Sequence, residues 1–190
     1  IEFLRDLADT ENEFIIENVY DTVNGGLIKI SSASASQNFE FDVLDPIYDL
    51  ELEGTNDPTV TLIDDLIVLN DFTLAGTGSD RFDLDENQLT LGGDLNNNLN
   101  NINGLNVTNS TILLDGGADQ YIQGTTETDF PVLSVDKTDG RVEMTLPSEI
   151  ESQLNIISET IIDINSNDLT LSENAWVYSD NGSNRQVEFG

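Results

Sequence analysis

The sequence predicts a mainly β protein: an elongated homotrimeric β-prism or β-helical fibre, with short N-terminal helices and a short trimeric coiled coil near residues 148–164. Three observations favour this class. Short apolar runs alternate with polar residues along most of the chain, which is typical of half-buried strands. No long apolar segment marks the centre of a single-chain core. An Asn-rich stretch carries one thin row of aliphatic residues, which suits a core shared between chains.

That Asn-rich stretch lies between Leu89 and Ile122. Six of the eight residues from Asn96 to Asn103 are asparagine, a residue that disfavours helix interiors. The isolated apolar residues fit neither a helix nor a strand; they are Leu95, Leu99, Ile102, Leu105 and Val107. One row of this kind buries too little surface to order a lone chain, whereas parallel copies would share it on a common axis. A disordered Asn-rich linker is the alternative.

The chain divides into five expected segments. They are a helical attachment segment at 1–26, a β-rich module at 27–88, a fibre-shaft β module at 89–146, a short coiled coil at 147–165 and a terminal β module at 166–190. Helical spacing in the first segment involves Ile1, Leu4 and Ala8, then Ile16, Val19, Tyr20 and Val23, with Asp9 or Thr10 as a cap and Gly25-Gly26 as a stop. These helices either cover a sheet end or dock onto a neighbouring protein.

From Leu27 onward the apolar period is two, and turns separate the expected strands. Those strands lie at 27–31, 39–43, 48–54, 60–63, 66–69, 72–74, 82–84, 89–91, 111–114, 120–123, 130–135, 141–146, 168–171, 175–179 and 186–189. Asp139-Gly140 falls between two alternating runs, which predicts a β-hairpin there.

The expected coiled coil begins with a capping box formed by Ser148 and Glu151. Behind it, apolar residues are spaced four, three, four and three apart at Ile150, Leu154, Ile157, Ile161 and Ile164. Isoleucine at the d positions favours three or four strands over two. A single helix packed on a sheet and an Ile-rich strand from Ile156 onward are the alternatives. A monomeric β-sandwich is the competing architecture for the whole chain.

The charge is strongly negative, with 37 acidic and 6 basic residues giving −31. This balance repels nucleic acid and anionic membranes, so both are excluded as partners. Asp outnumbers Glu and only two lysines occur, as in proteins of extreme halophiles. Repulsion among these charges fades when the screening length falls to about 3 Å at 1 M salt. We therefore expect dissociation or unfolding in dilute buffer.

Missing residue types narrow the chemistry further. The chain has no Cys and no His, which excludes disulfides, thiolate nucleophiles, Cys/His zinc sites and imidazole bases. No apolar run approaches the roughly 18 residues that a membrane span needs. The chain opens at Ile1 instead of Met, so we expect a processed chain or a fragment of a longer protein.

No residue is assigned to catalysis, cofactor binding or metal binding. Carboxylates cluster at Asp64/Asp65 and at Asp83/Asp85/Glu86, where solvated turns are expected in place of an acid–base pair. Asp163, Asn165 and Asn167 resemble the start of a calcium loop, but Asp168 replaces the required Gly and Glu173 comes one position early. Only weak, non-specific cation binding is expected at such turns.

Trp176 and Tyr178 are the candidate binding residues. They alternate with Ala175 and Val177 on an expected strand. We expect this aromatic pair to be buried; an exposed pair that stacks on a sugar is the alternative.

The stretches LTLGGDLNNNLNNINGLNV, STILLDGGADQYIQG and FPVLSVDKTDGRVEM resemble shaft segments of the tail fibres of tailed viruses. The resemblance covers Leu89 to Met144. It implies a non-enzymatic homotrimer on the virion, outside the cell, that helps attach to the host surface. Implied partners are other tail and baseplate proteins and, as a candidate, a host-surface glycan or glycoprotein. The acidic balance adds a halophilic archaeon or bacterium as host. No C-terminal autoproteolytic chaperone is recognisable.

Two other functions compete with this one. A filament or surface-layer protein of a halophilic cell, assembled by β-strand exchange, fits the same composition. A fibre-borne polysaccharide hydrolase with paired carboxylates is a third hypothesis, although the chain is short and poor in aromatic residues for a glycan cleft.

Overall fold

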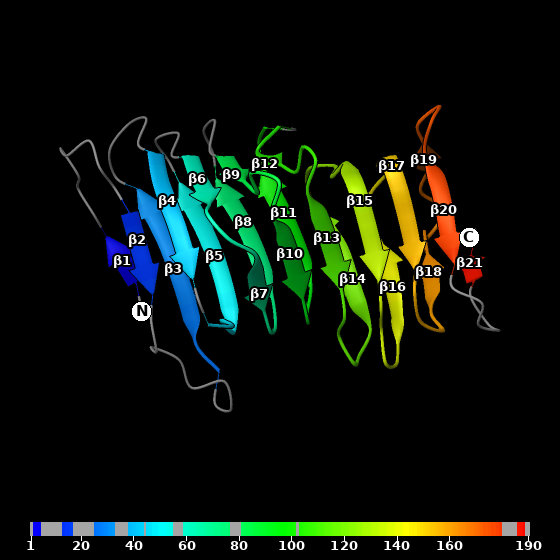
Figure 1. Ribbon diagram of the computed structural model, residues 1–190, viewed down its shortest axis with the longest axis horizontal. Helices are drawn as coiled ribbons and strands as arrows, with labels where there is room; N and C mark the ends of the chain where they lie inside the picture. Colours follow the sequence, from blue (N-terminus) through cyan, green and yellow to red (C-terminus); the bar gives the residue numbers. More distant parts are fainter. Residues whose placement is uncertain are drawn as a thin grey trace.

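The chain winds into a β-solenoid of about six turns, in which every strand pair is parallel (Figure 1). The computed structural model describes residues 2–4, 13–16, 25–32, 38–43, 45–54, 59–76, 81–101, 103–179 and 186–188. These residues contain strands and turns and no helix. The mainly β, β-helical part of the expected fold is therefore confirmed.

Three parallel sheets form the walls of the solenoid. The nine-stranded sheet contains β1 (Glu2–Leu4), β3 (Leu27–Ser32), β5 (Asp49–Gly54), β8 (Phe72–Gly76), β11 (Leu95–Leu99), β14 (Gln120–Gly124), β16 (Arg141–Met144), β18 (Ile161–Asp163) and β21 (Gln186–Glu188). The seven-stranded sheet contains β7 (Leu66–Val68), β10 (Gln88–Leu91), β13 (Thr111–Leu114), β15 (Phe130–Val135), β17 (Ser148–Ile156), β19 (Leu169–Leu171) and β20 (Trp176–Ser179). The five-stranded sheet contains β2 (Glu13–Ile16), β4 (Asn38–Val43), β6 (Thr59–Leu62), β9 (Arg81–Asp83) and β12 (Leu105–Asn106).

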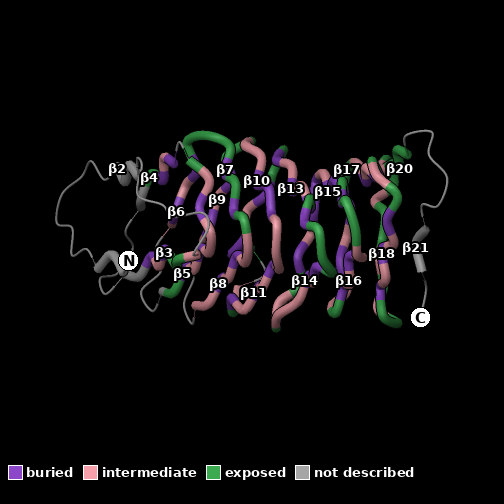
Figure 2. The backbone as a smooth tube through the Cα atoms, turned by 90° about the horizontal axis from the view of Figure 1, so that it is seen from below, coloured by how far each residue is buried: buried purple, intermediate pink, exposed green. Residues whose placement is uncertain are grey.

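The core is a set of aliphatic and aromatic rows that run along the solenoid. In the nine-stranded sheet Leu50 pairs with Phe72, and Phe72 pairs with Leu95 of the next turn. Alternation along each strand sends these side chains inward, and stacking of successive turns covers them. Figure 2 shows that buried positions recur from turn to turn along the solenoid. A single hydrophobic cluster thus extends from Ile28 to Ile164.

The expectation that the aliphatic row of the Asn-rich stretch packs between chains is wrong. Leu95 and Leu99 are fully buried, and Leu105 is 7% exposed, within one chain. Ile102 lies outside the described residues. This aliphatic row buries too little surface only when the Asn-rich stretch is considered without the neighbouring turns. Neighbouring turns supply the missing contacts, since Leu95 pairs with Phe72 on one side and Ile122 on the other.

The prediction of N-terminal helices is also wrong for the residues of this segment that the structure describes. Glu2–Leu4 and Glu13–Ile16 are strands, and they pair with β3 and β4. Pairing with the next turn outweighs the helical spacing, because tertiary context overrides local propensity. The other residues of this expectation lie outside the described part, namely Ile1, Ala8, Asp9, Thr10, Val19, Tyr20 and Val23. Gly25 and Gly26 lead into β3, and Gly25 has a φ of 76°.

The expected coiled coil is a β-strand, and its apolar spacing of four fits a strand as well as a helix. Residues Ser148–Ile156 form β17, whose register against β15 shifts between Phe130↔Ile150 and Val132↔Gln153. Ile150 and Leu154 are both buried, and residues four apart share one face of a strand just as they share one face of a helix. The remaining heptad positions fall on the following turn, where Ile157 is exposed and Ile164 is buried.

The expected hairpin at Asp139-Gly140 is wrong as well. The strands on either side belong to different sheets, with β15 beside β13 and β17, and β16 beside β14 and β18. Gly140 adopts a φ of 74° and turns the chain from one wall of the solenoid to the next. The uniformly parallel pairing also excludes the antiparallel sandwich for the described residues.

Candidate functional site

The outer face of the seven-stranded sheet carries two rows of uncharged side chains. The pairing register places these side chains in line across successive turns. One row contains Ile67, Thr90, Leu113, Ser134, Asn155 and Tyr178, and the other contains Gln88, Thr111, Val132, Gln153 and Trp176. We call these two rows the uncharged face. Thr90 and Ser134 are buried within the first row, and the other side chains are half-buried or exposed. In a chain of charge −31, neither row contains a carboxylate, ammonium or guanidinium group.

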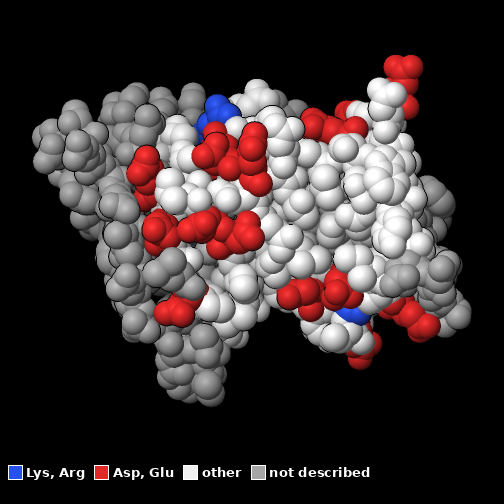
Figure 3. Space-filling view, in the orientation of Figure 1, with Lys and Arg blue, Asp and Glu red and all other residues white. Residues whose placement is uncertain are grey.

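The outer face of the nine-stranded sheet includes charged side chains that form ion pairs. Lys29 forms ion pairs with Glu51 and Glu53, and Arg141 contacts Asp163 at 3.3 Å. Figure 3 shows acidic side chains gathered over part of the visible face, while the surface around β17 and β20 is mostly uncharged. Charge is therefore distributed unevenly around the solenoid.

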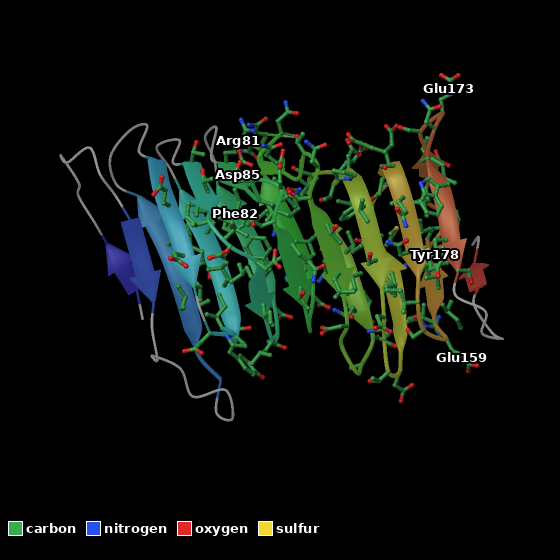
Figure 4. All side chains as sticks on the ribbon, in the orientation of Figure 1. Arg81, Phe82, Asp85, Glu159, Glu173 and Tyr178 are labelled. Carbon is green, nitrogen blue, oxygen red and sulfur yellow. The ribbon has the colours of Figure 1, made fainter. Side chains whose placement is uncertain are left out.

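Trp176 and Tyr178 lie on the uncharged face, and the expectation that they are buried is wrong. Their side chains are 52% and 46% exposed. The rings meet edge to face, with centroids 6.2 Å apart. Val177, between them, is in register with the inward-pointing Leu154, so the two aromatic side chains point outward. Figure 4 labels Tyr178 beside β20.

Amide side chains on β17 line up beside the aromatic pair. Gln153 pairs with Trp176 across the ladder, and Asn155 pairs with Tyr178. Gln153 Nε2 donates to Asn155 Oδ1, and Asn155 Nδ2 donates to Ser134 Oγ at 2.9 Å. Each amide nitrogen carries two N–H donors and uses one of them in this row. We call Gln153, Asn155, Trp176 and Tyr178 the aromatic–amide patch.

The chemistry that this patch offers is recognition of an uncharged partner. Aromatic rings give broad apolar contact, and side-chain amides both donate and accept hydrogen bonds. The two rows hold no carboxylate to act as a general acid, base or nucleophile. The arrangement therefore suits binding and positioning.

The acidic residues around Asp83 form a turn. Asp83 contacts Arg81 at 3.3 Å and accepts a hydrogen bond from the backbone N–H of Asp85 at 3.1 Å. Asp85 and Glu86 have φ values of 46° and 69°, so they shape the left-handed turn that leads to β10 (Figure 4). The Asp83 carboxylate thus stabilises this turn, while Asp85 and Glu86 are exposed on it.

Asp64 and Asp65 also lie in a turn. Both are exposed, and Asp65 Oδ1 accepts a hydrogen bond from the backbone N–H of Gln88, one turn further along, at 2.8 Å. The bond holds the start of β10 against the previous turn.

The residues that resemble a calcium loop use their polar atoms within the solenoid. Asp163 bonds the backbone N–H of Asn165 and the guanidinium of Arg141. Asn165 donates to Glu143 Oε1 at 2.7 Å, and Asn167 donates to the carbonyl of Met144 at 3.1 Å. Glu173 lies on the loop between β19 and β20, at the edge of the molecule (Figure 4). These contacts explain the Asp/Asn spacing through bonds between turns.

The described part of the chain has neither a metal-binding cluster nor a membrane-spanning helix. No group of three or more His, Cys, Asp or Glu side chains there is arranged to hold a metal ion. No helix in that part of the chain has the length and apolarity that crossing a bilayer requires.

Sequence analysis missed a buried lysine in the turn between β15 and β16. Lys137 is 2% exposed, and its ammonium group donates to three oxygens, the carbonyls of Gly116 and Ala118 and the side chain of Gln120, at 2.6–2.9 Å. Desolvation by burial lowers the pKa of Lys137 from 10.5 to about 8, against the opposing effect of nearby Asp119 and Asp115. The rarity of lysine in this chain was the available signal. Its bonds join neighbouring turns, which is a structural role.

Comparison with models of protein families, with curated proteins and with solved structures found no match. A function for this chain is therefore argued from its geometry and charge.

Proposed function

We propose that this chain is a structural module of a homotrimeric tail fibre or related virion appendage that contributes to attachment at the surface of a halophilic host. Its role is mechanical and adhesive. The observation that carries the proposal is the stacked core from Ile28 to Ile164. Each turn of a solenoid contacts only its neighbours, so such a core makes an extended, stiff spacer and can be lengthened turn by turn.

The uneven charge supports the same function. A surface rich in carboxylates stays soluble in concentrated salt, where repulsion is screened. The uncharged face provides a place for contact with a partner. An appendage needs both properties, because it must remain in solution and yet bind.

The trimer in this proposal differs from the one that the sequence suggested. Leu95, Leu99 and Leu105, the residues expected on a shared axis, are already covered within one chain, so they do not supply an axial core for three chains. The trimer must instead be formed through the outer surface of the solenoid.

A filament of a halophilic cell is the second candidate, and one observation favours it. Leu171 and Val177 occupy core-side positions in register with Ile150 and Leu154, yet they are 44% and 48% exposed. Another copy that added a turn here would cover these two side chains, as strand exchange between copies requires.

Mass measurement in molar KCl, combined with small-angle X-ray scattering, tests the proposal. We expect an elongated particle with the mass of three chains, and loss of that particle on dialysis into dilute buffer. Open polymers of growing length would support the cellular filament. A compact scattering profile would contradict both candidates.

A further inference from the structure

We propose that the aromatic–amide patch is a binding site for a neutral polysaccharide made of pyranose rings. The inference rests on the proposed function in attachment and names the partner and the residues that contact it. Three features of the patch carry it: the exposed ring pair, the amide row beside it and the absence of charge along both rows of the uncharged face.

The ring pair gives the apolar part of the contact. A pyranose ring has a face of C–H groups that packs on an aromatic ring, and burying an exposed aromatic side chain is favourable. Trp176 and Tyr178 are about half exposed and follow one another along the outer face of β20. Their edge-to-face contact holds the two rings in a fixed relative orientation.

The amide row gives the polar part. Sugar hydroxyls both donate and accept hydrogen bonds, and side-chain amides match this because they do the same. Gln153 and Asn155 stand directly beside the two rings in the ladder. Their mutual bond, with the bond from Asn155 to Ser134, fixes the orientation of the amides before a ligand arrives.

Charge decides between a neutral glycan and other partners. A polyanion such as an acidic glycan or a nucleic acid would be repelled by a chain of charge −31. A second copy would bring the same negative charge towards the patch, including the carboxylates of Glu149 and Glu151 on the first half of β17. A neutral polysaccharide is not repelled in either of these ways.

The sole tryptophan of the chain is Trp176, so its fluorescence reports on this patch directly. The full chain is titrated in molar KCl with a neutral β-glucan, mannan, galactan and xylan, and with polygalacturonate as an anionic control. We expect a saturable change in emission with at least one neutral polysaccharide and none with polygalacturonate.

Three variants locate the site. Tyr178→Ala should weaken binding about tenfold through loss of one stacking ring. Gln153→Ala should weaken it several-fold through loss of hydrogen bonds. Ile63→Ala is the matched control, because Ile63 is an exposed apolar residue away from the patch, and its binding should equal that of the wild type. Circular dichroism checks that each variant is folded.

Other outcomes separate this inference from the proposed function. If none of the four neutral polysaccharides changes the fluorescence of Trp176, or if Tyr178→Ala binds with unchanged affinity, a glycan site here is excluded. A dimer that forms as protein concentration rises and is lost in Tyr178→Ala would assign the patch to a second copy. Elongated trimers that bind no glycan would retain the proposed function and overturn only this inference. A compact monomer that binds glycan through Tyr178 would retain this inference and overturn the proposed function.

Discussion

Asp71 Oδ1 accepts a hydrogen bond from the backbone N–H of Asp94, one turn further along the solenoid, at 2.8 Å. The same bond recurs at the entrance to other strands of the nine-stranded sheet. Asp49 bonds the N–H of Asp71 at 3.1 Å, and Asp94 bonds the N–H of Tyr121 at 2.9 Å. Part of the acidic composition thus holds successive turns together through a column of aspartates.

The column predicts that Asp94→Asn raises stability in dilute buffer at neutral pH. Burial raises the pKa of Asp94 from 3.8, and the charge of Asp71 adds to this, while the N–H of Tyr121 opposes it. A raised folded-state pKa means that ionisation costs the folded protein more than the unfolded chain, so this cost is present at neutral pH and disappears as the carboxyl becomes protonated. Asparagine keeps an acceptor for Tyr121 without the charge.

Urea unfolding of the wild type and Asp94→Asn at several pH values checks this. The advantage of the variant should shrink as the pH falls towards the ordinary aspartate pKa. A variant that is less stable than the wild type at neutral pH would show that the negative charge itself is needed for the bond.

Lys137→Met should destabilise the fold strongly. The substitution leaves the carbonyls of Gly116 and Ala118 and the side chain of Gln120 without their common donor in a buried site, which costs about 2–4 kcal/mol in the free energy of unfolding. Lys29→Met is the control, since Lys29 forms its ion pairs on the surface and should contribute less than about 1 kcal/mol. Equal losses in urea unfolding for both variants would contradict the structural role of Lys137.

The pKa of Lys137 also predicts a dependence of stability on pH. The folded protein releases this proton near pH 8, whereas an unfolded lysine keeps it to about 10.5. Between these values the unfolded state binds more protons, so the contribution of Lys137 to the free energy of unfolding rises with pH. Subtracting the pH profile of Lys137→Met from that of the wild type isolates this slope. A difference that falls between pH 8 and 10 would refute the lowered pKa.

Substitution by alanine should lower stability at one of two neighbouring glycines and leave it nearly unchanged at the other. A Cβ at Gly116 would lie 2.1 Å from the carbonyl oxygen of Gly92 in the previous turn, so Gly116→Ala forces the turns apart. A Cβ at Gly117 meets only the Thr138 hydroxyl, at 3.3 Å. We expect a loss of about 2–3 kcal/mol or more for Gly116→Ala and little change for Gly117→Ala, measured by thermal unfolding. Similar melting temperatures for the two variants would argue against the close stacking of turns at this corner.

The strands were predictable because alternation is local, but their pairing was not. The runs at Phe39–Val43 and Tyr48–Gly54 show their two faces in a few residues, and β4 and β5 lie there. The turn period was present in the spacing of Asp49, Asp71 and Asp94, each followed by an apolar residue. Unequal turns obscure it, since the linked residues are 22, 23 and 27 positions apart.

The candidate patch shows a different limit of sequence analysis. Alternation at Trp176 and Tyr178 indicates that they share a face, but not whether that face is the core. The small neighbouring residues Ala175 and Ser179 do not indicate which face of the strand is buried. Only the register of Val177 with Leu154 shows that the aromatic residues point outward. Likewise, residues four apart share a face in both a strand and a helix, so the spacing of Ile150 and Leu154 does not distinguish β17 from a heptad without the partner strand.

Paired cysteines test the solenoid register most directly, because the natural chain has no cysteine. Thr73 and Asn96 are partners in adjacent turns, and partner positions about 4.8 Å apart lie within disulfide range. In dilute protein, Thr73→Cys with Asn96→Cys should form an intrachain disulfide. Thr73→Cys with Gln123→Cys, two turns apart, should not. Cross-links that form only between chains, or equally in both pairs, would contradict a core built by one chain.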